Sequence, residues 1–176
     1  TVMKAVTLAH DNKINYLVAV GGGSVIDGTK FIAHAIPYTG EDAWELAIHP
    51  EKITKTTPLA TVLTLPATGS EMNYRGVLSR RRTQEKVSFI TPKSSPQFSI
   101  LDPEVTYTLP KKQLSNGIVD AFMHIMEQYM TTTGNGILMD RWAEGVLLSL
   151  IEIGPRVLEN QKDYDTMANF MLCASM

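Results

Sequence analysis

The sequence predicts an α/β part followed by a separate helical part. Two short apolar runs, at residues 16–20 and 59–65, have the length and composition of strands in a parallel sheet. A helical pattern follows the first run, and from about residue 110 only helical patterns remain. Strands that alternate with helices and then give way to helices alone indicate two kinds of packing. We therefore expect one domain over residues 1–106 and a second over residues 107–176.

The expected α/β part opens with Val2, Val6 and Ala9 at helical spacing. The run at 16–20 is continuously apolar, so we expect a strand that is buried on both faces. A helix should follow over residues 25–36 and end before Pro37. The remaining elements expected here are a short helix at 42–48, the strand at 59–65, a hairpin of 77–80 with 86–90, and a strand at 98–101.

Three longer helices are expected in the second part, at residues 114–130, 137–153 and 164–176. Turn signals separate them, at Gly134-Asn135-Gly136 and at Gly154-Pro155. The first and last residues of the chain both read as helix without a capping signal. We therefore expect a fragment that is cut through a helix at each end.

Composition excludes several classes of protein. Of the 176 residues 44% are apolar, and the net charge is −2, which argues against a disordered chain and a general nucleic-acid binder. A single cysteine, Cys173, cannot form an internal disulfide. No run is long enough for a membrane helix, and the first residues lack the pattern of a signal peptide. These features favour a cytoplasmic, globular protein.

Glycines stand between the first strand and the helix that follows it. Gly21, Gly22 and Gly23 would let a ligand approach the backbone, and Ser24 could cap the helix, whose amino end suits a phosphate. The usual dinucleotide fingerprint does not match, because residue 26 is not glycine. The nucleoside-triphosphate loop does not match either, because Gly28 is followed by Thr29-Lys30 and not by lysine and then serine or threonine. The alternative is a tight turn that needs glycine only for a positive φ.

A second turn of small and polar residues, 64–71, follows the other buried strand. In a parallel sheet it would open at the same edge as the glycine turn, which is where such sheets bind ligands. Together the two turns could hold a pyrophosphate and a nicotinamide carboxamide, although an ordinary polar loop has the same composition. The basic cluster at 80–82 lies in a hairpin turn without interleaved aromatic residues, so a solvated turn is favoured over a nucleic-acid site.

Asp120 and His124 lie four residues apart in an expected helix and so share one face. A carboxylate and an imidazole suit a divalent ion such as Fe²⁺ or Zn²⁺. Two ligands are too few for a catalytic site, and nothing marks His10, His34 or His49 as a third. Either the pair is structural, or further ligands lie on a segment outside these residues.

These motifs together resemble the iron-containing, group III alcohol dehydrogenases. The residues at 16–30 (YLVAVGGGSVIDGTK) are similar to the first cofactor turn of that family, and 64–71 (TLPATGSE) to its second. The metal-site signature is matched by Pro110-x₆-Gly117-x₂-Asp120-Ala121-Phe122-x₄-Glu127, with Ser115 as a departure at a place where a small aliphatic residue is usual. The bacterial NADPH-dependent aldehyde reductases and butanol dehydrogenases resemble it most.

The resemblance implies an incomplete α/β nucleotide-binding (Rossmann-like) domain and the first helices of an all-helical domain. It implies pyrophosphate contacts at Gly22, Gly23 and Ser24, and cofactor contacts at Thr64, Thr68, Asn73 and Lys86. Asp120 and His124 would be the first two metal ligands, with no catalytic residue beyond the metal ligands. The family's other two ligands are histidines farther downstream, and no residue after His124 is a histidine.

The implied function is hydride transfer between NAD(P)H, with NADP(H) favoured, and a small aldehyde or primary alcohol. The alternatives are a related polyol dehydrogenase and a non-catalytic nucleotide-binding module in which Asp120 and His124 are structural. We expect a homodimer at full length, no nucleic-acid or membrane partner, and no activity from these 176 residues alone.

Overall fold

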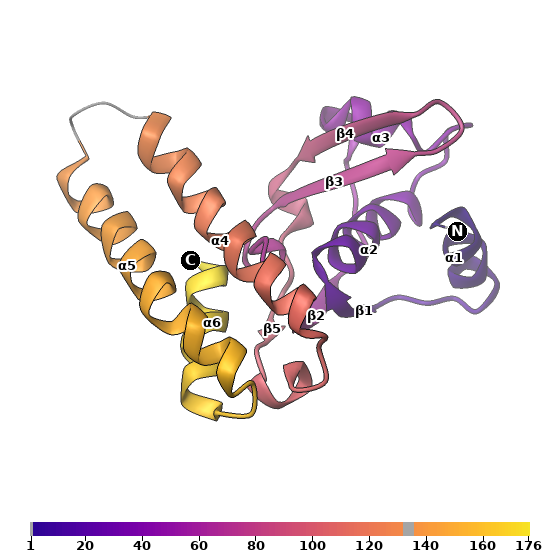
Figure 1. The fold of residues 1–176 in the computed structure, drawn as a ribbon. Helices are drawn as coiled ribbons and strands as arrows, with labels where there is room; N and C mark the ends of the chain where they lie inside the picture. Colours follow the sequence, from indigo (N-terminus) through magenta and orange to yellow (C-terminus); the bar gives the residue numbers. More distant parts are fainter. Residues whose placement is uncertain (1, 132–135) are drawn as a thin grey trace. The chain divides into compact units, whose positions relative to one another are not determined.

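The computed structural model describes residues 2–131 and 136–176, which form two compact units (Figure 1). One unit contains the residues up to Val62 together with Ser70–Ile100, and the other contains Leu63–Gly69 and Leu101–Met176. The chain thus leaves the first unit within a strand, after Val62, returns to it at Ser70, and leaves again after Ile100. The domain boundary expected near residue 106 stays a prediction.

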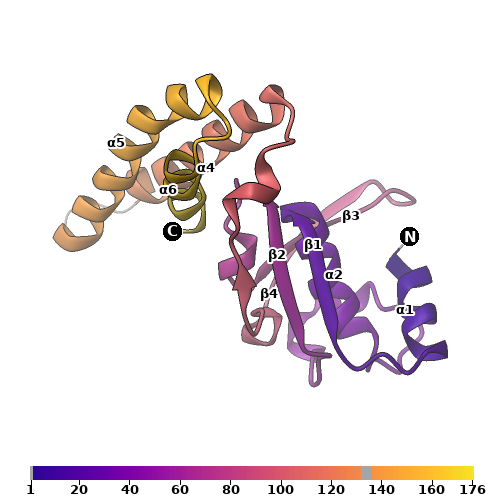
Figure 2. The same ribbon diagram turned by 90° about the horizontal axis from the view of Figure 1, so that it is seen from below.

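A parallel sheet lies at the centre of the first unit. Its strands in the described residues are β1 (Leu17–Gly22), β2 (Leu59–Leu65) and β5 (Ser99–Ile100), in the order β1-β2-β5 (Figure 2). β2 and β5 run parallel, with Thr61 opposite Ser99. The expected α/β arrangement is therefore confirmed, and β2 spans the residues that the apolar run predicted.

Helices and a hairpin complete the first unit. The helices are α1 (Val2–Asp11), α2 (Gly23–Ala35) and α3 (Glu45–Ile48), and the antiparallel hairpin is formed by β3 (Arg75–Arg80) and β4 (Glu85–Ile90). α2 packs against α1, β1 and β3. Phe31 of α2 and Phe89 of β4 are buried edge to face, with their ring centres 6.3 Å apart. α2 is thus the central helix of the unit.

β1 differs from its prediction. Ala19 is buried, whereas Val18 and Val20 are 58% and 61% exposed. The expectation of a strand buried on both faces was wrong, because the helix that follows it covers one face only and no described residue covers Val18 and Val20. A continuous apolar run reports that a strand is hydrophobic and cannot report what lies on each side of it.

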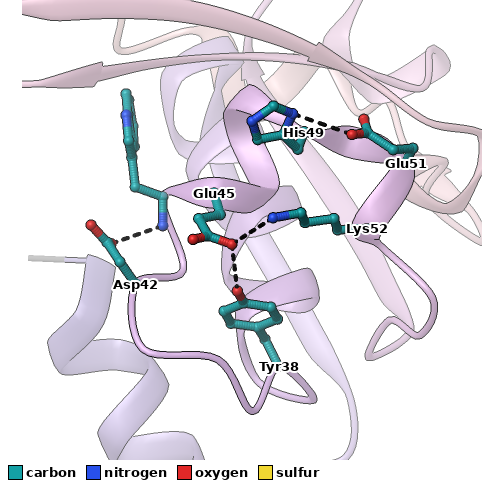
Figure 3. Close-up of polar contacts among 7 residues, drawn as sticks. Tyr38, Asp42, Glu45, His49, Glu51 and Lys52 are labelled. Carbon is teal, nitrogen blue, oxygen red and sulfur yellow. Dashed lines mark hydrogen bonds and ion pairs between the residues drawn. The ribbon is translucent and has the colours of Figure 1, made fainter.

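Polar contacts hold the loop that follows α2 (Figure 3). One carboxylate oxygen of Glu45 accepts hydrogen bonds from the Tyr38 hydroxyl at 3.1 Å and from Lys52 Nζ at 2.8 Å. Asp42 accepts from the backbone N–H of Trp44 and pairs with Arg80, whose guanidinium lies 5.4 Å from the centre of the Trp44 ring. Arg80 is thus paired within its own unit, whereas Arg81 and Arg82 lie exposed in the turn that follows β3, which fits the expected solvated turn.

The second unit is helical. Its long helices are α4 (Lys111–Thr131), α5 (Ile137–Glu159) and α6 (Tyr164–Ser175). Leu114, Leu150 and Phe170, one from each helix, are buried in their common core. The shorter one-turn helices of the chain are η1 (Pro50–Lys52), η2 (Ser70–Met72), η3 (Pro92–Ser94) and η4 (Pro103–Thr106). None of the described helices is long and apolar enough to cross a membrane.

The turn expected at Gly154-Pro155 is wrong. α5 continues through Pro155 and ends at Glu159. Gly154 is buried where α5 packs on α4, and a Cβ on it would lie 3.3 Å from Ile118, so tertiary contacts hold the helix together across the proline. The other turn signal falls largely on residues 132–135, which lie outside the described residues.

Candidate functional site

The glycine turn lies where β1 ends and α2 begins. Gly22 is the residue before the helix and has an extended backbone, with φ −86° and ψ −171°. α2 starts at Gly23, so Ser24 is its second residue, and the expectation that Ser24 caps the helix was wrong. No side chain caps this helix end. The first N–H groups of α2 therefore have no capping side chain, the arrangement in which a helix start accepts an anion.

The glycines of this turn do not need a positive φ. Among the described glycines, only Gly69 has one, at 62°. At Gly21, by contrast, a Cβ would lie 2.6 Å from the side chain of Val25, so glycine is required for the close packing of the strand end on the helix. The alternative in which the turn needs glycine only for a positive φ is therefore wrong for this structure.

A buried lysine connects α2 to the segment that carries Asn73. Lys30 is fully buried, and its Nζ donates to the backbone oxygens of Ser70, Asn73 and Arg75 at 2.7, 2.9 and 2.6 Å. It also lies 3.2 Å from Ser70 Oγ and 3.1 Å from Asn73 Oδ1. Five oxygen atoms of one short segment thus lie within hydrogen-bond distance of the three ammonium protons.

Carboxylates surround this ammonium. Asp27, one turn before Lys30, accepts from Ser70 Oγ at 2.5 Å and from the backbone N–H of Val77 at 2.9 Å. Glu71 is 2% exposed. Burial lowers the pKa of Lys30 to about 8, and the charges of Asp27 and Glu71 oppose that shift. Sequence reasoning missed this cluster; the only signal was the i, i+3 spacing of Asp27 and Lys30 on one helix.

The proposed cofactor residues of the first unit lie in different surroundings. Asn73 is half-buried, and its Oδ1 accepts from Lys30 and, at 2.9 Å, from the backbone N–H of Arg75. Its side chain is therefore fixed by the buried cluster. Lys86 is exposed on β4, opposite Ser79 in the hairpin. Gly22, Gly23 and Ser24 share the start of α2, which is the helix that carries Lys30.

Thr64 and Thr68 belong to the second unit. Thr64 is half-buried near the end of β2, and Thr68 is exposed in the loop that follows. This loop lies against α4, because a Cβ on Gly117 would touch the carbonyl oxygen of Pro66. Gly69, with its positive φ, closes the loop beside the backbone of Ala174 at the end of α6.

The expected metal-ligand pair lies on α4. Asp120 Oδ2 and His124 Nε2 are 3.6 Å apart, and the two side chains are 46% and 50% exposed. They fit a divalent ion as a carboxylate and imidazole pair on one helix face, open to further ligands. No group of three or more metal-binding side chains occurs in the described residues, so the pair is at most half of a four-ligand shell.

His34 and His49 lie in the first unit, whereas Asp120 and His124 lie in the second. His49 lies on the surface of the first unit in an ion pair with Glu51 at 3.2 Å (Figure 3). His34 is buried and hydrogen-bonded to Ser94 Oγ at 2.7 Å. In the second unit an apolar hollow opens between α4 and α5, and neither Asp120 nor His124 lines it. Its lining includes Ile125, Tyr129, Met139 and Trp142.

Comparison with known proteins decides the family. The family model described as iron-containing alcohol dehydrogenase matches residues 1–103, which is more than half of the chain. The chain belongs to the iron-containing alcohol dehydrogenase family. The glycine turn, the 64–71 turn and the structure of α2 all lie within the matched residues. The family expected from the sequence motifs is therefore confirmed.

Several relatives of this dehydrogenase family align along almost the whole chain. The NADPH-dependent aldehyde reductase YqhD of Escherichia coli is 49% identical over 177 aligned residues, covering 99% of this chain and 46% of that protein. The NADH-dependent butanol dehydrogenase B of Clostridium acetobutylicum is 40% identical and covers 100% of this chain and 45% of that protein. The chain therefore spans about half the length of the relatives it matches.

Solved structures show the same correspondence. The crystal structure of Escherichia coli YqhD superposes with a TM-score of 0.96 at 48% identity, over 99% of this chain and 45% of that one. The NADH-dependent butanol dehydrogenase A of Thermotoga maritima gives a TM-score of 0.93 at 37% identity, over 99% and 43%. The Rossmann-like sheet followed by helices is thus the arrangement of this family.

Proposed function

We propose that this dehydrogenase transfers hydride between a nicotinamide cofactor and a small aldehyde or primary alcohol. The observation that carries the proposal is the 49% identity with an NADPH-dependent aldehyde reductase along 99% of the chain. The glycine turn of α2 and the pair of Asp120 and His124 supply, in one chain, the two kinds of group that such a reaction needs. The polyol dehydrogenase and the non-catalytic module are outcomes of the tests below.

The residues proposed to hold the cofactor are those that the sequence motifs indicate. The uncapped start of α2 at Gly22, Gly23 and Ser24 would bind the pyrophosphate through backbone N–H groups. Thr64 and Thr68 would contact the cofactor near its phosphates and nicotinamide, and Asn73 and Lys86 would complete the pocket. NADP(H) is favoured because an NADPH-dependent relative has the higher identity, 49% against 40% for an NADH-dependent one.

Asp120 and His124 would hold the metal, which we propose to be Fe²⁺ or Zn²⁺. A divalent ion bound there supplies Lewis-acid polarisation of the substrate oxygen. The chain's own contribution would be to present a carboxylate and an imidazole on one face of α4, with Asp120 Oδ2 and His124 Nε2 3.6 Å apart. The cofactor-binding residues would orient the nicotinamide so that hydride passes between it and the substrate carbon. We also propose a homodimer for the full protein.

The metal assignment is tested in the full protein with Asp120→Ala and His124→Ala. Each variant is expected to lose most of its bound metal and its aldehyde reductase activity together, because each removes one ligand. His49→Ala is the matched control, since His49 also lies beside a carboxylate, at 3.2 Å from Glu51, but in the other unit. Metal content is measured by elemental analysis after purification. Unchanged metal content in both variants would show that the pair is structural.

The substrate class is tested with a panel of aldehydes, primary alcohols, glycerol and phosphorylated sugars on the unaltered full protein. We expect turnover of aldehydes with NADPH. Preferential turnover of glycerol or a phosphosugar would assign the polyol or phosphosugar reaction instead. Cofactor binding without turnover of any substrate would favour the non-catalytic module.

A further inference from the structure

Lys30 is a buried charge for which the proposed reaction has no direct use. Its side chain is fully buried on α2, two turns after the uncapped start of that helix at Gly23. A buried ammonium is costly unless it is hydrogen-bonded and its charge is compensated. This one has five hydrogen-bond acceptors, and the charges of two nearby carboxylates favour its protonated form. All five of its acceptors lie on Ser70, Asn73 and Arg75. The lysine therefore donates its hydrogen bonds to a single segment.

That segment has little regular structure of its own. Apart from the single turn η2, residues 70–74 belong to no helix or strand. Backbone carbonyls that regular structure would satisfy elsewhere are here turned toward one ammonium. Asp27 holds the far end of the same segment through the N–H of Val77. Two side chains of α2, one turn apart, therefore tie residues 70–77 to that helix, while Ser99 and Thr91 hold the same segment from other parts of the unit.

The same two parts of the molecule carry proposed cofactor contacts. Gly22, Gly23 and Ser24 stand at the start of α2, and Asn73 stands in the segment held by Lys30. We propose that Lys30 is a positioning residue for the nicotinamide cofactor, because its ammonium holds Asn73 and its neighbours at a set spacing from the glycine turn. The inference rests on the proposed function. A site that is already in place before the cofactor arrives binds it without the entropic cost of ordering the segment.

A second buried tether on the same helix supplies a matched control. His34, one turn after Lys30, is hydrogen-bonded through Nε2 to Ser94 Oγ at 2.7 Å, and both residues are at most 1% exposed. This contact also joins α2 to a distant segment, but η3, which contains Ser94, carries no proposed cofactor residue. Loss of the His34–Ser94 contact should therefore destabilise the unit without changing the cofactor site.

The experiment compares Lys30→Met and Ser94→Ala in the full protein. Methionine has about the length of the four-carbon stem of lysine and lacks the ammonium. The dissociation constant for NADPH is measured by nucleotide fluorescence, and the melting temperature by circular dichroism. Lys30→Met is expected to raise the dissociation constant about tenfold or more, whereas Ser94→Ala is expected to lower the melting temperature but leave the constant within about twofold.

Kinetics separate positioning from a general loss of structure. In Lys30→Met the KM for NADPH should rise much more than kcat falls, and the KM for the aldehyde should stay near its original value. If Lys30→Met does not fold, Ser70→Ala replaces it, since it removes the hydroxyl that links Lys30 to Asp27. An increase of about threefold in the dissociation constant is expected for that milder change.

The proposal is overturned if Lys30→Met, or Ser70→Ala in its place, lowers the melting temperature as Ser94→Ala does but binds NADPH as tightly as the unaltered protein. Lys30 would then stabilise the fold and nothing more. Failure of the proposed function gives a different result, because the unaltered protein would then bind neither NADPH nor NADH.

Discussion

Gly117 of α4 lies so close to Pro66 that a Cβ on the glycine would stand 2.4 Å from the proline carbonyl oxygen. The loop that follows β2, with Thr68, is thereby held against the helix that carries Asp120 less than one turn later. Within the second unit, a proposed cofactor loop and the proposed metal ligands thus share one support. The glycine in the metal-site signature is explained by this close approach.

Gly117→Ala should destabilise the protein. The added methyl meets a backbone oxygen, which cannot move aside as a flexible side chain would. We expect the free energy of unfolding to fall by about 1–3 kcal/mol, as for other overpacked sites. Urea denaturation measures the change. Gly145→Ala in α5 is the control, because nothing lies within 4 Å of its Cβ, and a gain of about 1 kcal/mol is expected from helix propensity alone. A gain at both positions would contradict the close contact at Gly117.

His34 should make the protein sensitive to acid. Burial lowers its pKa from 6.5 to about 4, and the positive charges of Lys93 and Lys30 add to the shift. Its Nδ1 is buried without a hydrogen-bond partner in the described residues, which also favours the neutral ring. The unfolded chain therefore binds a proton below pH 6.5 that the folded protein does not bind until about pH 4.

Stability from His34 is thus fully present above pH 6.5 and is lost as the pH falls toward 4. The loss is expected to reach about 3 kcal/mol. His34→Gln, which cannot titrate, should flatten this part of the curve of unfolding free energy against pH. An equally steep curve in His34→Gln would assign the acid sensitivity to other groups.

Pro155 should limit the stability of α5. Proline has no N–H for the helical bond to Ile151, and its ring crowds the preceding turn, yet the helix continues to Glu159. Pro155→Ala restores that bond and is expected to raise the free energy of unfolding by about 1–3 kcal/mol, less a small loss from the freer unfolded chain. Thermal unfolding provides the measurement. Pro92→Ala should give no gain, because Pro92 is the first residue of η3 and no helical bond is missing there. No gain at Pro155 would mean that α5 absorbs the proline without strain.

Local patterns predicted many elements correctly and failed where neighbours decide. β2 has the predicted limits at Leu59 and Leu65, because a β-branched and leucine-rich run before a proline has few alternatives. The turn at Gly154-Pro155 was wrong, since packing of Gly154 against α4 outweighs the usual effect of the proline. Ser24 was expected as a cap, but the extended Gly22 takes that position. The first failure was decided by a contact with another helix, and the second by the backbone angles of Gly22.

The sequence by itself determined the family, the order of strands and helices, and the residue types of the candidate site. Those features are local: the glycine turn, the i, i+4 pair of Asp120 and His124, and the apolar run of β2 are each read within a few residues. Only the tertiary structure decided that Lys30 is buried among acceptors forty or more residues away, and that Gly117 supports the loop at Pro66. A buried charge and a missing Cβ take their meaning from the atoms that surround them, and folding brings those atoms from distant segments.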